Sequence, residues 1–452
     1  MTGIPLIIAF VVAVVLMIIA ISKWKVHPFL SIMGVSVLLA LVAGIPLTDV
    51  PGVIGAGFSG TFSSIGIVII LGALIGSILE QTGAALKLAD MVVKLVGKKN
   101  PELALELMGW VVSIPVFCDS GFVILDPIRK ALVKRTGSSS VAATVALSAG
   151  LYISHVFIPP TPGPIAAANT LGIGDNLLLV IGLGVLCSIF PLAAGLVYAK
   201  FIGKKVKSKD ELVEAGEVVK TYEELVAGYG KLPNGFNALA PIIVPVILMA
   251  LGTIGKQLGV TGFALNLLTF LGTPIISLAV GTIFAIAQLA IAKKMGEFYK
   301  ITNDTLKTVG PILFVTAAGG VLGKVISSTT MVAYITENAN FLMNLGIFFP
   351  FLLAAILKTA QGSSTVAITT TAGIMAPMMV SLGLGTPALG ALTVMAIGAG
   401  AMTVSHANDS YFWVVTNFGD MTPDQGYKTQ TILTLVMGIA SIIGIFLVSL
   451  FF

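Results

Sequence analysis

Long apolar runs separated by short loops are the feature that most constrains what this chain can fold into. Of its 452 residues, 56% are hydrophobic and only 10% are charged, whereas about 25% of the residues in a soluble domain are charged. A helix needs roughly 20 apolar residues to cross about 30 Å of hydrocarbon. The composition therefore excludes a soluble globular domain and predicts an all-α protein that crosses a lipid bilayer many times.

About ten segments are long and apolar enough to be predicted as spanning helices. They fall near residues 4–22, 28–46, 62–80, 139–170, 177–199, 238–255, 275–292, 309–327, 387–417 and 430–451. Polar or proline-rich motifs interrupt 139–170 and 387–417, so these two are predicted to be broken helices. Two further apolar stretches, about 102–128 and 341–378, carry polar residues at mid-length and are predicted to be re-entrant hairpins.

The distribution of lysine and arginine predicts the topology, because positive residues collect on the cytoplasmic side of a membrane. Such residues flank 102–128 at both ends, and a hairpin that enters and returns keeps both flanks inside. The hydrophilic segment 200–236 is expected to be a cytoplasmic linker, and both chain termini are expected outside. Residues 1–199, with a cytoplasmic-side hairpin, and 237–452, with an outward-side hairpin, then form two repeats of inverted topology.

The two halves also share short motifs. Both halves contain a matching pair of glycines four residues apart and a Ser-His pair. These are Gly72 and Gly76, Gly319 and Gly323, Ser154-His155, and Ser405-His406. Inverted repeats of this kind are the architecture of many secondary transporters.

Several other functional classes lack the residues that they need. Cys118 and Cys187 are the only cysteines and lie in apolar runs, so neither a disulfide framework nor a metal site is expected. A glycine spacing at 55–60 resembles a dinucleotide-binding loop, but no βαβ pattern surrounds it. A membrane enzyme would need a hydrolase motif, and a passive channel would need a continuous polar stripe. We expect no enzyme, no cofactor and no nucleic-acid partner.

Polar residues inside the apolar runs gather in four motifs, and such residues usually mark a transport pathway. Two motifs lie in the hairpins, at 115–122 and 358–365, and two in the broken helices, at 154–164 and 405–410. Each combines residues that break a helix with hydroxyls, amides or acids. Unwound backbone at membrane depth is tolerated only where it is buried in protein or lines a cavity. We therefore expect the motifs to form the binding site.

The expected ligand is an anion, because the N-terminus of a half-helix presents free N–H groups and the positive end of its dipole. Gly362 with Ser363, Ser364 and Thr365 is predicted to hold a substrate carboxylate at a hairpin tip. The other predicted substrate-binding residues are Ser120, His155, Gln361, His406, Asn408 and Asp409. Lys358 is interpreted as snorkelling to an interface or paired with an acid.

Two acids are predicted to couple transport to protons. Asp119 is the main candidate, because burial in apolar surroundings favours the neutral, protonated form of a carboxylic acid. Asp126 lies seven residues further on, and on a continuous helix it would share the face of Asp119 and modulate it. The alternative for Asp126 is an ion pair with Arg129 at the cytoplasmic surface.

At the four motifs the sequence resembles the gluconate permease (GntP) family. The resemblance is carried by SHVFIPPTPGP at 154–164, AQGSSTVA at 360–367 and SHANDSYFW at 405–413, together with the shorter IPVFCDSGFV at 114–123. It implies proton-coupled uptake of a sugar acid, or a related hydroxy or amino acid, across the inner membrane. Similarity to the wider ion-transporter superfamily implies a transport domain that moves against a dimeric scaffold.

Two departures from the family pattern leave the substrate open. Thr161 stands where family members often have a second histidine, and Asp126 stands where an apolar residue is expected. Gluconate is the first candidate among small hydroxylated monocarboxylates. D-serine, glycerate or a dicarboxylate are the alternatives, and sodium could replace the proton.

Overall fold

The computed structural model describes residues 3–96, 100–212, 232–257, 261–331, 334, 345–406 and 409–452. Within these ranges the chain forms helices and no strand, so the predicted all-α class is confirmed. The first half contains α1 (Ile4–Ser22), α2 (Pro28–Ala43), α3 (Val50–Gln81), α4 (Ala84–Val96), α5 (Pro101–Val112), α6 (Cys118–Thr136), α7 (Ser140–Phe157), α8 (Pro162–Thr170), the 3-10 turn η1 (Gly174–Asn176), α9 (Leu177–Ile202) and α10 (Lys209–Leu212).

The second half repeats much of this order. It contains α12 (Gly235–Gln257), α13 (Gly262–Gly272), α14 (Pro274–Ile291), the 3-10 turn η2 (Met295–Glu297), α15 (Phe298–Ser327), α18 (Phe348–Gln361), α19 (Ser364–Met375), the 3-10 turn η3 (Ala376–Met378), α20 (Pro387–Met402), α21 (Ser410–Phe418), α22 (Pro423–Gly426), the π-helical turn η4 (Tyr427–Thr431) and α23 (Ile432–Ser449).

The described residues include seven helical segments that are long and apolar enough to cross a membrane. An eighth is added if α3 and α4, bent by 78° at their junction, count as one span. Two predicted segments, 28–46 and 387–417, are not among them, because α2 and α20 have only 16 residues each. Sixteen residues of helix extend about 24 Å, which is less than the hydrocarbon thickness of about 30 Å. The multi-pass character is confirmed, while the number of ten stays a prediction.

Each stretch predicted to be a re-entrant hairpin contains a pair of packed helices, and their re-entry into the membrane stays a prediction. Hairpin 1 consists of α5 and α6 joined by residues 113–117, and hairpin 2 consists of α18 and α19. The turn of hairpin 2 depends on Gly362, whose φ of 89° is left-handed and favours glycine. Residues 341–344 of the predicted second hairpin lie outside the described residues.

Both predicted broken helices are also present. In broken helix 1, α7 ends at Phe157 and α8 begins at Pro162, because the intervening prolines cannot continue the backbone hydrogen bonds of a helix. In broken helix 2, α20 ends at Met402 and α21 begins at Ser410. Asp409 caps α21 by accepting a hydrogen bond from the backbone N–H of Tyr411, at 3.1 Å.

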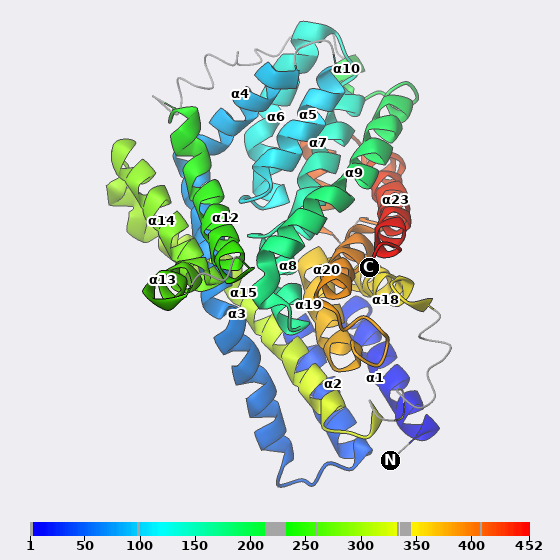
Figure 1. Cartoon of the computed structure of the whole chain (residues 1–452). Helices are drawn as coiled ribbons and strands as arrows, with labels where there is room; N and C mark the ends of the chain where they lie inside the picture. The colour runs from blue at the N-terminus through cyan, green and yellow to red at the C-terminus, as the bar shows by residue number, and fades with distance from the viewer. Residues whose placement is uncertain are drawn as a thin grey trace.

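The long helices α3 and α15 pack against each other along their length and support both hairpins (Figure 1). Gly76 of α3 lies directly against the carbonyl of Pro115 in hairpin 1, and Gly323 of α15 lies against the backbone of Gly373 in hairpin 2. A Cβ atom at either glycine would overlap with that backbone. The glycine motifs therefore bring the long helices into close contact with the two hairpins.

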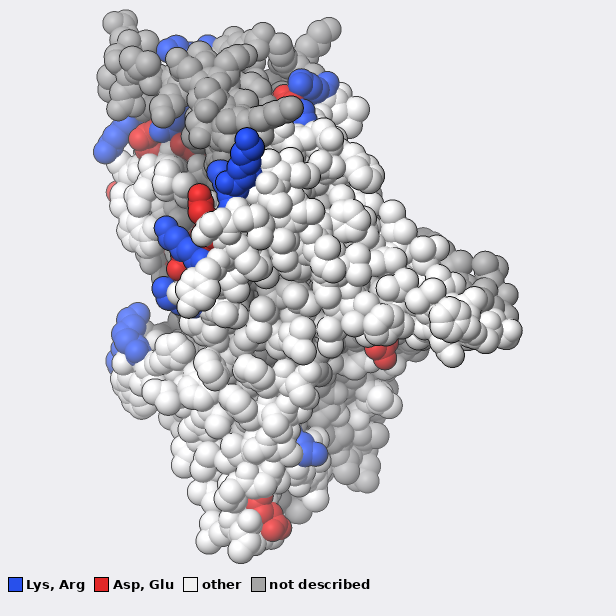
Figure 2. Space-filling model, turned by 90° about the vertical axis from the view of Figure 1, so that its left-hand side faces the viewer, with Lys and Arg blue, Asp and Glu red and all other residues white. Residues whose placement is uncertain are grey.

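The order of a hairpin, a broken helix and a long helix occurs twice, as α5 to α9 and as α18 to α23. This order agrees with two internal repeats, and their inverted orientation stays a prediction. Residues 213–231 of the predicted linker 200–236 lie outside the described residues. On the face shown in Figure 2, most of the lysine and arginine side chains lie near the upper end and along the left edge. The remainder of this face has only a few charged side chains.

Candidate functional site

The two hairpins and the two broken helices meet at one cavity of about 330 Å³. Both hairpins contribute their turns, and each broken helix contributes residues next to its break. The lining residues are Phe117, Cys118, Asp119, Ser120, His155, Thr308, Ile312, Ser363, Ser364, Thr365, Asp409, Ser410 and Tyr411. Four motifs that are far apart in the sequence therefore form a single polar site within an apolar helical protein.

Three helices begin at this cavity. The first residues of α6, α19 and α21 all line it. The first N–H groups of a helix have no acceptor within the helix, and no side chain caps α6 at its N-cap residue Phe117. Three positive dipole ends and several free donors thus converge on one space, which favours a bound anion.

Asp119 lies in the first turn of α6 and lines the cavity. Its Oδ1 accepts a hydrogen bond from the Ser410 hydroxyl at 3.2 Å, and its Oδ2 accepts a weak one from the Cys118 thiol at 3.6 Å. Both donors are neutral, and among the described residues no lysine, arginine or histidine forms an ion pair with Asp119. Asp119 therefore places in the cavity wall an acid that has no ion-pair partner among the described residues.

His155 contributes an unpaired nitrogen to the same cavity. Its side chain is only 4% exposed, and its Nδ1 has no hydrogen-bond partner among the described residues. The ring lies 6.0 Å from the ring of Phe117 and 6.5 Å from that of Tyr152, measured between centroids. A buried polar atom without a partner is costly, so a ligand hydroxyl is a natural partner for it.

Lys358 is paired with an acid, one of its two predicted interpretations, and the structure identifies that acid as Asp409. The Lys358 Nζ lies 2.6 Å from Asp409 Oδ2, and the two side chains are 0% and 6% exposed. The ammonium group also donates to the carbonyl of Gly362 in the turn of hairpin 2. Asp409 lines the cavity as predicted, but its charge is balanced by Lys358.

The remaining predicted substrate ligands are distributed as follows. The cavity lining includes Ser120, Ser363, Ser364 and Thr365. Gly362 is not part of the lining, and its carbonyl accepts a hydrogen bond from Lys358. His406 lies away from the cavity lining, with its Nε2 3.0 Å from the carbonyl oxygen of Thr359 in hairpin 2. The side chain of Gln361 and the whole of Asn408 lie outside the described residues.

Asp126 is not part of the cavity lining. It forms the ion pair with Arg129 that was the alternative interpretation, but the pair is buried and does not lie at a surface. Its Oδ1 accepts from Arg129 Nε at 2.6 Å, and its Oδ2 is 3.6 Å from Lys130 Nζ. Arg129 is fully buried and also donates to the hydroxyl of Ser140 and to the carbonyl of Phe418. This cluster joins α6 to the start of α7 and to the end of α21.

Sequence reasoning missed Tyr152 and did not identify the acid that pairs with Lys358. The Tyr152 hydroxyl lies 3.4 Å from Asp409 Oδ2, and its ring packs against that of Tyr411, with 5.0 Å between centroids. Tyr152 precedes His155 by three residues, so both lie on one face of α7. That spacing could have identified Tyr152, whereas the partner of Lys358 is 51 positions away.

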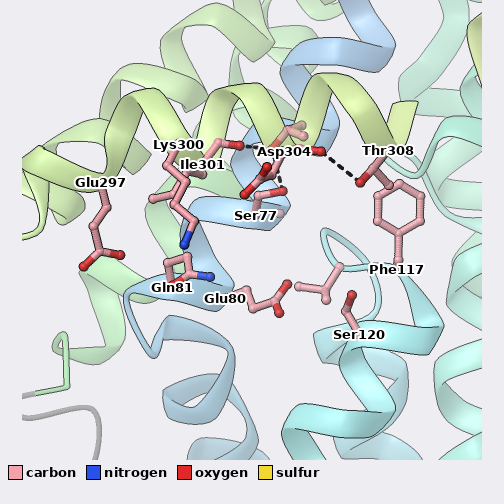
Figure 3. Close-up of a pocket in the computed structure, with 13 residues that line it drawn as sticks. Ser77, Glu80, Gln81, Phe117, Ser120, Glu297, Lys300, Ile301, Asp304 and Thr308 are labelled. Carbon is pink, nitrogen blue, oxygen red and sulfur yellow. Dashed lines mark hydrogen bonds between the residues drawn. The ribbon is translucent and has the colours of Figure 1, made fainter. Parts of the chain in front are cut away.

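A second hollow of about 200 Å³ adjoins the cavity and shares Phe117, Ser120 and Thr308 with it (Figure 3). Its walls come from the end of α3, the turn of hairpin 1 and the start of α15. Glu80 and Lys300 are among the charged side chains around it. The central cavity is therefore continued by a polar hollow between hairpin 1 and the α3–α15 pair.

Comparison with known proteins identifies relatives over nearly the whole length of the chain. The model of the GntP family permeases matches residues 4–451. An uncharacterized permease of Haemophilus influenzae is 34% identical, over 92% of this chain and 86% of that protein. The inner membrane permease YgbN of Escherichia coli is 32% identical, over 97% of each chain. The low-affinity gluconate transporter of Escherichia coli is 30% identical, over 98% of each chain.

A solved structure shares the fold at low sequence identity. The crystal structure of the Alcanivorax borkumensis YdaH transporter, described as having an unusual topology, superposes with a TM-score of 0.61. It is 16% identical, and the match covers 94% of this chain and 97% of that one.

Proposed function

The chain belongs to the GntP family of permeases, and on that premise we propose that it takes up a small hydroxylated monocarboxylate together with a proton. Its relatives are membrane permeases rather than enzymes. Gluconate is the first candidate substrate, because the relative from Escherichia coli that is 30% identical is named a low-affinity gluconate transporter. D-serine, glycerate and dicarboxylates are the alternatives.

The balance of charge around the cavity is the observation that carries the proposal. Lys358 compensates Asp409, whereas Asp119 lines the same space without an ion-pair partner among the described residues. Two negative charges about 5 Å apart, at an effective dielectric constant of about 20, repel each other by about 3 kcal/mol. An ionised Asp119 would thus repel a substrate carboxylate, and protonation removes that repulsion.

This repulsion links the proton to the substrate. If the substrate anion binds more tightly when Asp119 is protonated, then the proton binds more tightly when the substrate is present, by the same factor. The site therefore fills and empties with both together, which is the requirement for symport. Asp119 is the proposed coupling acid, and we assign Asp126 to its ion pair with Arg129.

The dimensions and donors of the cavity suit a small polar acid. A volume of about 330 Å³ lies at the lower end of the range of about 300–1,000 Å³ for small-molecule sites. We propose that the starts of α6 and α19, with Ser364 and Thr365, bind the carboxylate. The Nδ1 of His155 and the hydroxyls of Ser120 and Ser363 bind the substrate hydroxyls.

The adjoining hollow supports a route of release. It leads from the cavity, past Glu80 and Lys300, towards the lysine-containing loop between α14 and α15. We propose that this side is cytoplasmic, in keeping with the preference of positive residues for the inside. Both chain termini would then lie outside.

Uptake by purified protein in proteoliposomes tests the proposal. Radiolabelled gluconate, D-serine, glycerate and succinate are each supplied with an imposed pH gradient, and in parallel with an imposed sodium gradient. We expect concentrative uptake of gluconate driven by the pH gradient. If uptake of every acid only equilibrates, without accumulation under either gradient, the protein is not a symporter of these substrates.

A further inference from the structure

The ammonium group of Lys358 lies where two unwound segments of the chain meet. Lys358 is in the last turn of α18, and its side chain is 0% exposed. Nζ donates to the carbonyl of Gly362 in the turn of hairpin 2 and to Asp409 Oδ2 at the break of broken helix 2. It also lies 5.8 Å from the centroid of the Tyr152 ring. One cation thus joins hairpin 2 to broken helix 2.

Two oxygen atoms that could bind a free metal cation contact this ammonium, the Gly362 carbonyl and Asp409 Oδ2, and two hydroxyls lie next to the second of them. Asp409 Oδ2 also accepts from the Ser405 hydroxyl at 2.5 Å and lies 3.4 Å from the Tyr152 hydroxyl. Broken helices in transporters bind Na⁺ through the carbonyls of unwound backbone and through helix C-terminal ends, and carboxylate oxygens are general ligands for hard cations. The C-terminal end of α18 adds the negative end of a helix dipole.

We propose that the Lys358 ammonium is a tethered cation that occupies this oxygen cage in place of a free metal ion. The inference rests on the proposed function, and it specifies that the carrier needs no Na⁺ at this position. Lys358 holds hairpin 2 against broken helix 2 and compensates Asp409 in every state of the cycle. No Na⁺ has to bind there, and the proton on Asp119 is left as the only mobile cation of the site.

Thermal unfolding of the detergent-solubilised protein tests the cage without depending on transport. The unfolding midpoint is measured in NaCl and in choline chloride at equal ionic strength. Wild-type protein should have the same midpoint in both, because the cage is occupied. Lys358→Ala empties the cage, so Na⁺ should raise its midpoint, as a ligand that binds only the folded state does. The exposed Lys307 supplies the matched control, Lys307→Ala, whose midpoint should not respond to Na⁺.

A midpoint of the wild-type protein that rises with Na⁺ would overturn the proposal, and so would a folded Lys358→Ala protein that ignores Na⁺. If Lys358→Ala does not fold, the double variant Lys358→Met/Asp409→Asn replaces it. That variant has neither charge, so it should fold and show no response to Na⁺. A double variant stabilised by Na⁺ would contradict the assignment of the cage to Asp409.

Uptake adds a second readout. Lys358→Ala should lose about a hundredfold of pH-driven uptake, because Asp409 stays buried without its partner. Methylammonium, a small soluble cation, should restore part of that uptake, as a purely structural role of Lys358 would not predict. Wild-type uptake that requires Na⁺ would refute the tethered cation. If the wild-type protein transports none of the acids, the proposed function fails, and the thermal experiment still decides the role of Lys358.

Discussion

Replacing Arg129 tests whether the buried cluster in hairpin 1 stabilises the fold or serves transport. Arg129 is 0% exposed and contacts Asp126 Oδ1 at 2.6 Å, the Ser140 hydroxyl at 2.6 Å and the Phe418 carbonyl at 3.2 Å. Arg129→Met leaves Asp126 buried, with only the half-buried Lys130 3.6 Å away. Loss of one partner from a buried ion pair lowers the free energy of unfolding by about 3–5 kcal/mol. Because Lys130 still partly compensates Asp126, we expect a loss of about 3 kcal/mol for Arg129→Met.

The companion variant Asp126→Asn should also lower the free energy of unfolding by about 3 kcal/mol, because the fully buried Arg129 guanidinium loses its counter-ion and keeps only neutral acceptors. Reversible unfolding in mixed SDS and detergent micelles measures both values. The double variant Arg129→Met/Asp126→Asn should lose less free energy of unfolding than the two single variants lose together, because the two residues are in contact. An Asp126→Asn protein of wild-type stability that no longer accumulates substrate under a pH gradient would refute the structural assignment. It would support Asp126 as a coupling acid.

Three further variants and one labelling experiment test other parts of the account. Ser364→Ala removes one hydrogen bond to a charged group, worth roughly 1.5–3 kcal/mol, and should raise the KM for uptake about 10- to 100-fold with a smaller change in kcat. Gly362→Val forces a β-branched residue into a left-handed turn and should abolish uptake; normal uptake would remove this turn from the site. Gly76→Val should lower stability and uptake, because its side chain overlaps with the backbone of hairpin 1; unchanged thermal stability would contradict that contact. Single cysteines at positions 2 and 215, in a cysteine-free background, should react with an impermeant thiol reagent in intact cells at 2 only, and the reverse pattern would invert the topology.

The elements of the site were predictable because breaking a helix inside a membrane requires particular residues. The prolines from Pro159 to Pro164 and the glycine at 362 identified one broken helix and one hairpin turn from the sequence. The polar residues beside these breaks identified Asp119, His155 and Asp409, which the structure brings to one cavity. Local chemistry therefore predicted the position of the site along the chain.

Pairing between distant residues could not be predicted in the same way. Lys358 lies in hairpin 2 and its partner Asp409 lies in broken helix 2, and no spacing rule connects them. His406 also matched a binding motif, yet it contacts the backbone of hairpin 2. Helix ends depend on packing too, since α2 and α20 stop at 16 residues where apolar sequence alone predicted longer spans.

Coupling of the proton to the substrate through Asp119 is the central claim, and accumulation in proteoliposomes tests it most directly. Wild-type and Asp119→Asn proteins are reconstituted in parallel, and labelled gluconate is measured inside the vesicles under an imposed pH gradient. Asparagine resembles the protonated acid, so Asp119→Asn should still exchange gluconate in counterflow but should not accumulate it. An Asp119→Asn protein that concentrates gluconate as the wild type does would contradict the account and move the coupling role to another group of the cavity.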